Sequence, residues 1–324
     1  MTDWTDPVVD VVIVNYRTGE LTVKCLESLE GERATLPGLR ATVVDNASGD
    51  GSADLIAAAI MAREWNWATL LRSEVNGGFS AGNNIGIASA FEQTAPPALV
   101  WLLNPDTRVM PGAAQALVSF MESTPRAGIA GSITLEEDET PWPFAFRFPT
   151  ILGEIERGSR WGLVSKLLKD HAIARLMGNS SEKVDWVQGA SMVIRRELLE
   201  QGPWLDEGYF LYYEETDFCR QARNNGWECW FVPQSVVLHM AGQSTGLTSS
   251  NAKIDRMPAY WFQSRQRYFL KNHGRFYAIL ADLGWMAGYL MFLSRRLVCR
   301  SQVTDPPKLL RDFLRHSALI PRRR

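Results

Sequence analysis

The chain has 324 residues, of which 46% are hydrophobic and 22% are charged, so it can bury a large core and is not the sequence of a disordered protein. Its formal net charge of −2 excludes a surface that attracts nucleic acid as a whole, although the C-terminal end is basic and finishes in Arg322-Arg323-Arg324. The four cysteines lie far apart with no CxxC pair, which argues against a zinc site or a disulfide framework and favours a reduced, cytoplasmic setting. The N-terminal residues include no apolar run of signal-peptide length, so we expect no export.

Strand-like and helix-like segments alternate through the first half of the chain. Buried strands are predicted from apolar runs at residues 8–14, 39–44, 68–71 and 99–103. Each run is followed by a segment with helical periodicity, at residues 20–29, 52–62, 81–91 and 113–122. This alternation is typical of an α/β fold, in which helices flank a mostly parallel central sheet and ligands bind at the carboxyl ends of the strands.

The second half of the chain is less regular. Between residues 136 and 185 we expect an irregular insertion near the site. Order resumes at residues 184–194, and residues 230–239 predict two short strands around Pro233. We place a domain boundary near residues 242–251, so that residues 1–245 form the α/β domain and residues 246–324 form a helical, basic and aromatic C-terminal extension.

The longest apolar segment of this extension covers residues 278–294. It contains Asp282 and is shorter than the roughly 20 residues that span a bilayer. Trp285 and Tyr289 within it, followed by Arg295-Arg296, fit a helix lying on an anionic membrane surface, and a helix packed on the protein's own core fits equally well. The expected location is therefore cytoplasmic, with peripheral association at the inner face of the membrane left open.

Polar residues follow each predicted strand of the first half, at positions 15–16, 45–46, 76–78 and 104–106. Asp45 could accept hydrogen bonds from a ribose or a base, or it could simply close an Asx turn. The glycines of residues 76–86, NGGFSAGNNIG, would let a phosphate or a sugar approach the backbone at a helix N-terminus. This segment matches neither GxGxxG nor the P-loop, which counts against a dinucleotide oxidoreductase and an ATPase.

A divalent cation is the expected cofactor. Asp106, in Asn104-Pro105-Asp106, stands at a strand end where a carboxylate could hold Mg²⁺ or Mn²⁺ between two phosphates, although Pro105 also fits a plain strand terminator. His239 ends the apolar run VVLH, where a histidine is more often a core or turn residue than a ligand. It becomes a candidate metal ligand only in combination with Asp106.

Three carboxylates gather in residues 209–223, YFLYYEETDFCRQAR, where an aromatic segment leads into a helix. Glu214, Glu215 and Asp217 are candidates for a catalytic base, because desolvation by aromatic neighbours can raise a carboxyl pKa towards the working pH. The alternative is that these acids only complement the dipole of the helix that follows. The residues alone leave both interpretations open.

Taken together, these motifs resemble the family-2 inverting glycosyltransferases, and within them the rhamnosyltransferase-like branch. The likeness covers about residues 8–245 and rests on VIVNY, VVDNAS, NGGFSAGNNIG, LLNPD, VQGASMVIRRE, FLYYEETDFCRQAR and HMAGQST. It implies a GT-A fold, a nucleotide-diphosphate sugar donor and a divalent metal ion. It also implies a single displacement that inverts the anomeric carbon.

The resemblance assigns roles on the donor side. Tyr16 and Asp45 would contact the nucleoside, while Asn76, Gly78 and Asn83 would line the diphosphate-sugar side. Asp106 corresponds to the last carboxylate of the family's DxD motif, with Asn104 in place of the first, and His239 would complete the metal shell.

On the acceptor side, Glu215 stands where the family usually has an aspartate as general base. Its extra methylene leaves Glu214 or Asp217 open as the base instead. Gly189 and Ala190 would border the acceptor opening. The favoured reaction moves L-rhamnose from dTDP-rhamnose to a glycan or a polyprenyl-linked acceptor in cell-surface polysaccharide synthesis.

Two other classes of function compete with this interpretation. A sugar-nucleotide nucleotidyltransferase would be expected to carry a basic glycine-rich loop after the first strand, where this chain has NYRTGE. A catalytically inactive glycan-binding or scaffold protein would need neither a base nor a metal residue. The retained acids argue against it.

Overall fold

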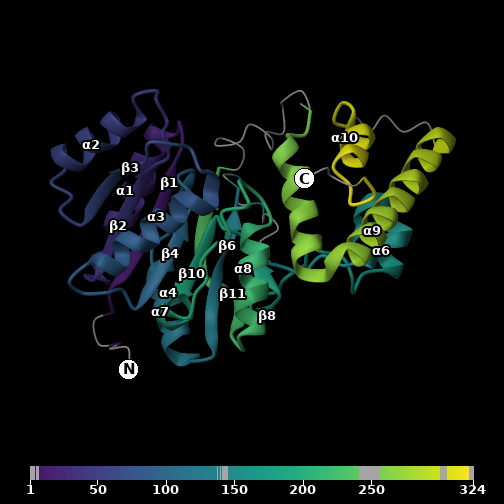
Figure 1. The fold of residues 1–324 in the computed structure, drawn as a ribbon. Helices are drawn as coiled ribbons and strands as arrows, with labels where there is room; N and C mark the ends of the chain where they lie inside the picture. Colours follow the sequence, from purple (N-terminus) through teal and green to yellow (C-terminus); the bar gives the residue numbers. More distant parts are fainter. Residues whose placement is uncertain are drawn as a thin grey trace.

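A computed structural model describes residues 4, 7–136, 138, 140, 145–240, 256–299 and 305–320. An α/β region carries the central sheet, and a group of helices that includes α6 (Gly162–Leu167), α9 (Ala259–Cys299) and α10 (Leu309–Arg315) lies beside it (Figure 1). The predicted domain boundary near residues 242–251, the end of the HMAGQST motif and the terminal arginines lie outside the described residues.

The first half of the chain forms the predicted βαβ units. Its elements are β1 (Val9–Asn15), α1 (Gly19–Glu32), β2 (Leu39–Asp45), α2 (Ser52–Ala62), β3 (Ala68–Arg72), α3 (Gly78–Glu92) and β4 (Leu99–Leu103). The strands pair in parallel in the order β3-β2-β1-β4. β-Branched and leucine side chains make β1 and β4 almost fully buried, as expected for strands covered on both faces.

Beyond β4 the sheet is mixed. The further elements are β5 (Thr107–Val109), α4 (Ala113–Ser123), β6 (Ala127–Leu135), β10 (Ser191–Arg195), α7 (Arg196–Glu200), α8 (Glu214–Asn224) and β11 (Glu228–His239). Strand β10 runs antiparallel between β4 and β6, and β11 pairs in parallel with β6 and antiparallel with β5. The α/β prediction is confirmed.

The prediction of two final strands around Pro233 is wrong, because β11 is one strand of 12 residues. Its register against β6 shifts between Val232 and Val236, so Pro233 lies in a bulge, where a missing N–H does not interrupt the ladder. The strand therefore continues to His239, beside Thr107 of β5.

Residues 136–185, expected to be irregular, contain regular elements. They are β7 (Ala145–Phe146), α5 (Ile151–Ser159), α6 and β8 (Glu182–Val184), with β9 (Trp186–Val187) directly after. Thr150 caps α5 by accepting a hydrogen bond from the Gly153 N–H at 3.1 Å. A glycine contact then brings α5 and α9 together, since a Cβ on Gly288 would stand 2.3 Å from the Ile155 carbonyl oxygen.

Helix α9 contains a break at Gly274, whose φ is 78°, and its second half packs against α5 and α10. It is long and apolar enough to cross a membrane by length and composition, and 44% of its apolar window is buried in the protein. Arg265 of α9 is buried, and its guanidinium pairs with Glu154 of α5 at 2.7 Å and with Asp282 further along α9. This network joins the helical group into one unit.

Candidate active site

The carboxyl ends of β1 and β2 carry a buried hydrogen-bonded group. Asn15 Nδ2 donates to Asp45 Oδ1 at 2.6 Å, and the Ser48 hydroxyl donates to the same oxygen at 2.6 Å. The Ser48 N–H also donates to Asp45 Oδ2, which gives Asp45 the local bonds expected of a turn residue. Tyr16 follows Asn15 and is half-buried, with the Arg17 guanidinium over its ring.

The glycine-rich segment forms a fixed turn before α3. Asn76 Oδ1 accepts from the Gly78 N–H and from Asn46 Nδ2, both at 3.0 Å. Gly78 has a φ of 84°, and a Cβ there would stand 2.1 Å from the Phe210 carbonyl oxygen, so only glycine fits. Asn83 does not face an opening, because its side chain is buried and bonded to the Phe79 carbonyl within α3.

The structure brings the two predicted metal ligands together. His239 Nε2 lies 3.4 Å from Asp106 Oδ1 and 3.4 Å from Asn104 Nδ2. No group of three His, Cys, Asp or Glu side chains that could hold a metal ion occurs among the described residues. The pair offers one carboxylate and one imidazole, so a hard cation bound there would take its other ligands from water and substrate phosphates, as Mg²⁺ commonly does.

The predicted acceptor-side residues lie beside this pair and the glycine turn. The Ala190 carbonyl accepts from the Asn104 N–H at 3.0 Å. A Cβ on Gly189 would stand 2.9 Å from the Phe79 ring, so a side chain there would force the start of α3 to move. These contacts place residues 189–190 between the β4 end and the glycine turn.

Two tyrosines in left-handed backbone conformations lead into α8. Tyr212 and Tyr213 have φ values of 70° and 69°, which are unfavourable for aromatic residues and are often retained at functional sites. The Tyr213 hydroxyl accepts a hydrogen bond from Arg157 of α5 at 3.2 Å. The turn places Glu215 at a cavity and Glu214 in the interior.

The cavity beside Glu215 has a volume of ≈ 370 Å³, and five of the twelve residues that line it are aromatic. Its other lining residues come from well separated parts of the chain and are Phe146, Pro149, Glu156, Arg157, Ile173, Ala174, Trp186, Tyr212, Tyr213, Thr216 and Trp261. The volume falls within the range of small-molecule sites. A sugar ring could enter it with an apolar face on an aromatic ring.

Burial raises the pKa of Glu215 from 4.5 to about 7, while the backbone N–H groups of Glu215 and Thr216 act in the opposite direction. Burial also raises the pKa of Glu214 well above its usual value, and the negative charge of Glu215 raises it further. Glu215 Oε2 has no hydrogen-bond partner within the described part of the chain. A carboxylate with a pKa near 7, facing a cavity, suits general base catalysis.

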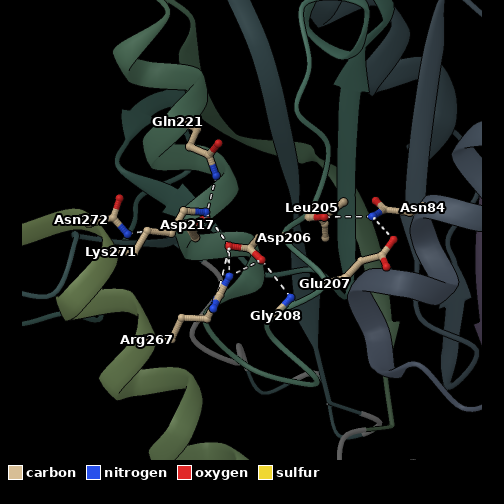
Figure 2. Close-up of polar contacts among 10 residues, drawn as sticks. All are labelled: Asn84, Leu205, Asp206, Glu207, Gly208, Asp217, Gln221, Arg267, Lys271 and Asn272. Atoms are coloured by element: carbon tan, nitrogen blue, oxygen red, sulfur yellow. Dashed lines mark hydrogen bonds and ion pairs between the residues drawn. The ribbon is translucent and has the colours of Figure 1, made fainter. Parts of the chain in front are cut away.

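Asp217, the other candidate base, faces away from the cavity. Its carboxylate is buried and accepts from Lys271 Nζ and Asn272 Nδ2 of α9, each at 2.6 Å, and from Gln221 at 2.6 Å (Figure 2). Three donors, from α8 and α9, therefore occupy both of its oxygens. The structure therefore makes Asp217 an anchor that ties the first turn of α8 to α9.

The loop before α8 is fastened on both sides. Asp206 accepts from Lys271 at 2.7 Å and from Arg267 at 2.8 Å, while Asn84 of α3 donates to the Leu205 carbonyl and to Glu207, each at 2.9 Å (Figure 2). The Phe79 N–H donates to the Phe210 carbonyl at 2.8 Å. The segment that positions Glu215 thus spans from the glycine turn to the C-terminal helix.

Sequence reasoning missed Arg157, Glu156 and Trp261 as residues of the site. The Arg157 guanidinium lies 5.2 Å from the centre of the Trp261 ring, and Glu156 adds a second carboxylate to the cavity. No motif marks these positions, since they reach Glu215 only through the packing of α5 and α9.

Comparisons with known proteins identify the family of the chain. The model of "Glycosyl transferase family 2" matches residues 10–200. An N-acetylglucosaminyl-diphospho-decaprenol L-rhamnosyltransferase of Mycobacterium tuberculosis is 28% identical over 330 residues, covering 97% of this chain and 98% of the relative. A low-salt glycan biosynthesis hexosyltransferase of Haloferax volcanii is 28% identical over 221 residues, covering 66% of this chain and 61% of the relative.

Solved structures show the same fold. A mannosyltransferase of Pyrobaculum calidifontis in complex with GDP-mannose and Mn²⁺ superposes with a TM-score of 0.57 at 14% identity, covering 99% of this chain and 83% of the other. GalNAc-T7 with UDP, GalNAc and Mn²⁺ gives a TM-score of 0.59 at 14% identity, covering 97% and 55%. The protein therefore has the GT-A fold of glycosyltransferases. By its sequence, the chain belongs to glycosyl transferase family 2.

Proposed function

We propose that this protein is an inverting glycosyltransferase that moves a sugar from a nucleotide-diphosphate donor to an acceptor hydroxyl, with Glu215 as general base. The observation that carries the proposal is the position of Glu215, at an aromatic cavity and with its pKa raised to about 7. The base takes the proton of the acceptor hydroxyl as its oxygen bonds to the anomeric carbon. The bond to the nucleotide diphosphate breaks in the same step, and the configuration is inverted.

On the donor side, Tyr16 and Asp45 contact the nucleoside, and Asn76 and Gly78 line the diphosphate-sugar side. The position of Gly78 supports this role, since it is the first residue of α3 and a helix N-terminus favours a phosphate. Asn83 acts through the helix, because its side chain bonds inside α3.

Asp106 and His239, with Asn104 beside them, hold Mg²⁺ or Mn²⁺ in this proposal. When bound, the cation neutralises charge on the departing nucleotide diphosphate. Two structural neighbours were solved with Mn²⁺, which supports the choice of metal without extending to these residues.

We propose L-rhamnose, from dTDP-rhamnose, as the sugar and a polyprenyl-linked glycan as the acceptor. The relative from Mycobacterium tuberculosis, similar over nearly the whole of both chains, is named as an L-rhamnosyltransferase acting on N-acetylglucosaminyl-diphospho-decaprenol. Gly189 and Ala190 border the acceptor opening in this arrangement. The aromatic lining of the cavity supports a sugar ring as the group that meets Glu215.

The test is a screen of nucleotide-diphosphate sugars with Mg²⁺ or Mn²⁺ and an N-acetylglucosaminyl diphospholipid with a shortened chain. We expect release of dTDP from dTDP-rhamnose that depends on the acceptor, and a product with inverted anomeric configuration by NMR. A retained configuration would contradict the mechanism. Transfer of another sugar would contradict only the choice of donor, and release of pyrophosphate from a nucleoside triphosphate would favour a nucleotidyltransferase.

A further inference from the structure

The second half of α9 has two apolar faces, and only one of them is packed. Ala281, Trp285, Gly288 and Phe292 are buried against α5 and α10. The opposite face carries Phe276, Leu283, Leu290 and Leu297, which are 77%, 44%, 56% and 82% exposed. Residues seven apart lie on nearly the same side of a helix, so these four form one stripe of roughly 30 Å.

No charge interrupts this stripe. Asp282 is the only Asp, Glu, Lys, Arg or His residue between Arg275 and Arg295. It is buried and paired with Arg265. No described residue covers the stripe, because its side chains remain exposed with all the described elements in place. A monomeric soluble protein rarely leaves such a continuous apolar surface without a use for it.

Helix α6 adds further exposed apolar side chains near α9. Arg295 of α9 donates to the Arg160 carbonyl at 2.9 Å and lies over the Trp161 ring, and both of these residues stand directly before α6. Leu163 and Leu167 of α6 are 53% and 75% exposed. The apolar surface is therefore made by two elements far apart in the sequence.

Cations lie beside these apolar side chains. Lys166 and Lys169 in the α6 segment and Arg275 at the start of the stripe are exposed, and none of them forms an ion pair with any described residue. Asp170 is the one acid in residues 161–171. Apolar side chains next to unpaired cations match the acyl and headgroup layers of an anionic bilayer, whereas a second copy of this chain would bring the same cations against each other.

We infer that the stripe of α9, together with α6, is a docking surface for an anionic membrane, on which the protein lies without crossing it. The packed face of α9 and its buried Arg265–Asp282 pair exclude a position in which lipid surrounds the helix. The inference rests on exposure and charge alone and does not depend on the sugar that is transferred.

The test is cosedimentation of the full chain with vesicles of phosphatidylcholine containing phosphatidylglycerol, without donor or acceptor. We expect Leu290→Gln/Leu297→Gln to weaken binding about tenfold or more, since membrane affinity scales with buried apolar area. A matched control, Leu55→Gln/Met61→Gln, changes two exposed apolar residues of α2 and should bind like the wild type. Circular dichroism and melting show whether both double variants remain folded.

Lys166→Gln/Lys169→Gln should reduce binding to anionic vesicles and leave the weaker binding to neutral vesicles unchanged, and added salt should have the same effect. The inference is overturned if the intact protein stays in the supernatant, or if the α2 control loses binding as much as the α9 variant. It is also overturned if light scattering shows that the intact protein is a dimer which Leu290→Gln/Leu297→Gln disrupts, while the intact protein does not bind vesicles. The vesicle assay contains no donor or acceptor, so its result can be interpreted even if the proposed transfer reaction is not observed.

Discussion

The two sides of the site are assembled in different ways. On the donor side, Asp45 ends β2 and Asn104 follows β4, and both strands pair in parallel with β1 between them, so the sheet positions these residues. On the acceptor side, the neighbours of Glu215 come from β7, α5, β9 and α9, which are far apart in the sequence. The acceptor cavity can therefore change by altering helices while the sheet and its donor residues stay the same.

The acceptor side depends on a buried ion network for its shape. Arg265 donates to Glu154 Oε2 through Nε and Nη2, at 2.9 Å and 2.7 Å, and to Asp282, whose other oxygen accepts from the Ala318 N–H. Its guanidinium also lies over the rings of Phe269 and Phe313. Glu154 in turn pairs with Arg157, which lines the cavity, so the network reaches the site directly.

The largest expected effect comes from breaking this network. Arg265→Met leaves two buried carboxylates without their shared partner, and losing one member of a buried ion pair costs about 3–5 kcal/mol. We expect a large fall in the free energy of unfolding, measured by urea denaturation, together with loss of transfer. The control is Arg267→Met on the same helix, whose exposed pair with Asp206 should contribute about 0–1 kcal/mol.

Equal stability of the two variants would show that the acceptor side does not depend on the network. If Arg265→Met loses only the helical structure of the C-terminal region while the sheet stays folded, the difference between the donor and acceptor sides becomes clearer. It would mean that the two sides unfold separately, and donor binding should then survive in Arg265→Met.

The next effect concerns chemistry. Glu215→Gln preserves size but removes basicity, so turnover should fall by roughly 10²-fold or more, while donor affinity barely changes because the loss falls on the transition state. Glu156→Gln is the matched control, since Glu156 is the other carboxylate that lines the cavity. If Glu156→Gln is inactive and Glu215→Gln works, the mechanism stands and the base is misassigned.

The sequence predicted the strands that carry the proposed donor-side residues because the signals of these strands are local. Each strand from β1 to β4 is an apolar run ended by polar residues, and such runs need no distant partner to be recognised. Helix α5 was missed because it has only nine residues, and the face it buries is defined by glycines of α9. Trp261 and Arg157 enter the site through that same long-range contact.

Asp217 shows most directly what could not be predicted from the sequence. In the sequence it is one of three acids in the first turn of a helix, and nothing local separates it from Glu215. Helical geometry turns residues two apart to nearly opposite sides, and the α9 partners Lys271 and Asn272 decide which side is buried. The pairing of Asp106 with His239, in contrast, follows from two strand ends in one sheet.

A smaller effect is expected on metal binding at the donor side. Asp106→Asn removes the charge of the proposed ligand and keeps its shape, so Mn²⁺ affinity in the presence of nucleotide diphosphate should fall about tenfold or more, measured by calorimetry. Asp54→Asn, which changes an exposed carboxylate of α2, should leave Mn²⁺ affinity nearly unchanged. Unaltered Mn²⁺ binding in Asp106→Asn, or full transfer in EDTA, would contradict a metal role for the pair.

The smallest effect is a pH dependence of stability that should appear on the acceptor side. The pKa of Glu215 is raised from 4.5 to about 7 because the carboxyl is buried, so the folded protein holds this proton more tightly than the unfolded chain does. The contribution of Glu215 to the free energy of unfolding must therefore fall as the pH rises from about 4.5 to about 7, and level off above. A glutamine does not titrate, so Glu215→Gln should gain stability relative to the wild type across this window, while Glu122→Gln on the exposed side of α4 should follow the wild type. Thermal melts of Glu215→Gln and the wild type at pH 5 and pH 8 test the direction of this change. If the variant is no more stable relative to the wild type at pH 8 than at pH 5, Glu215 is ionised in the folded protein without cost. The base would then lack the raised pKa on which its proposed role depends.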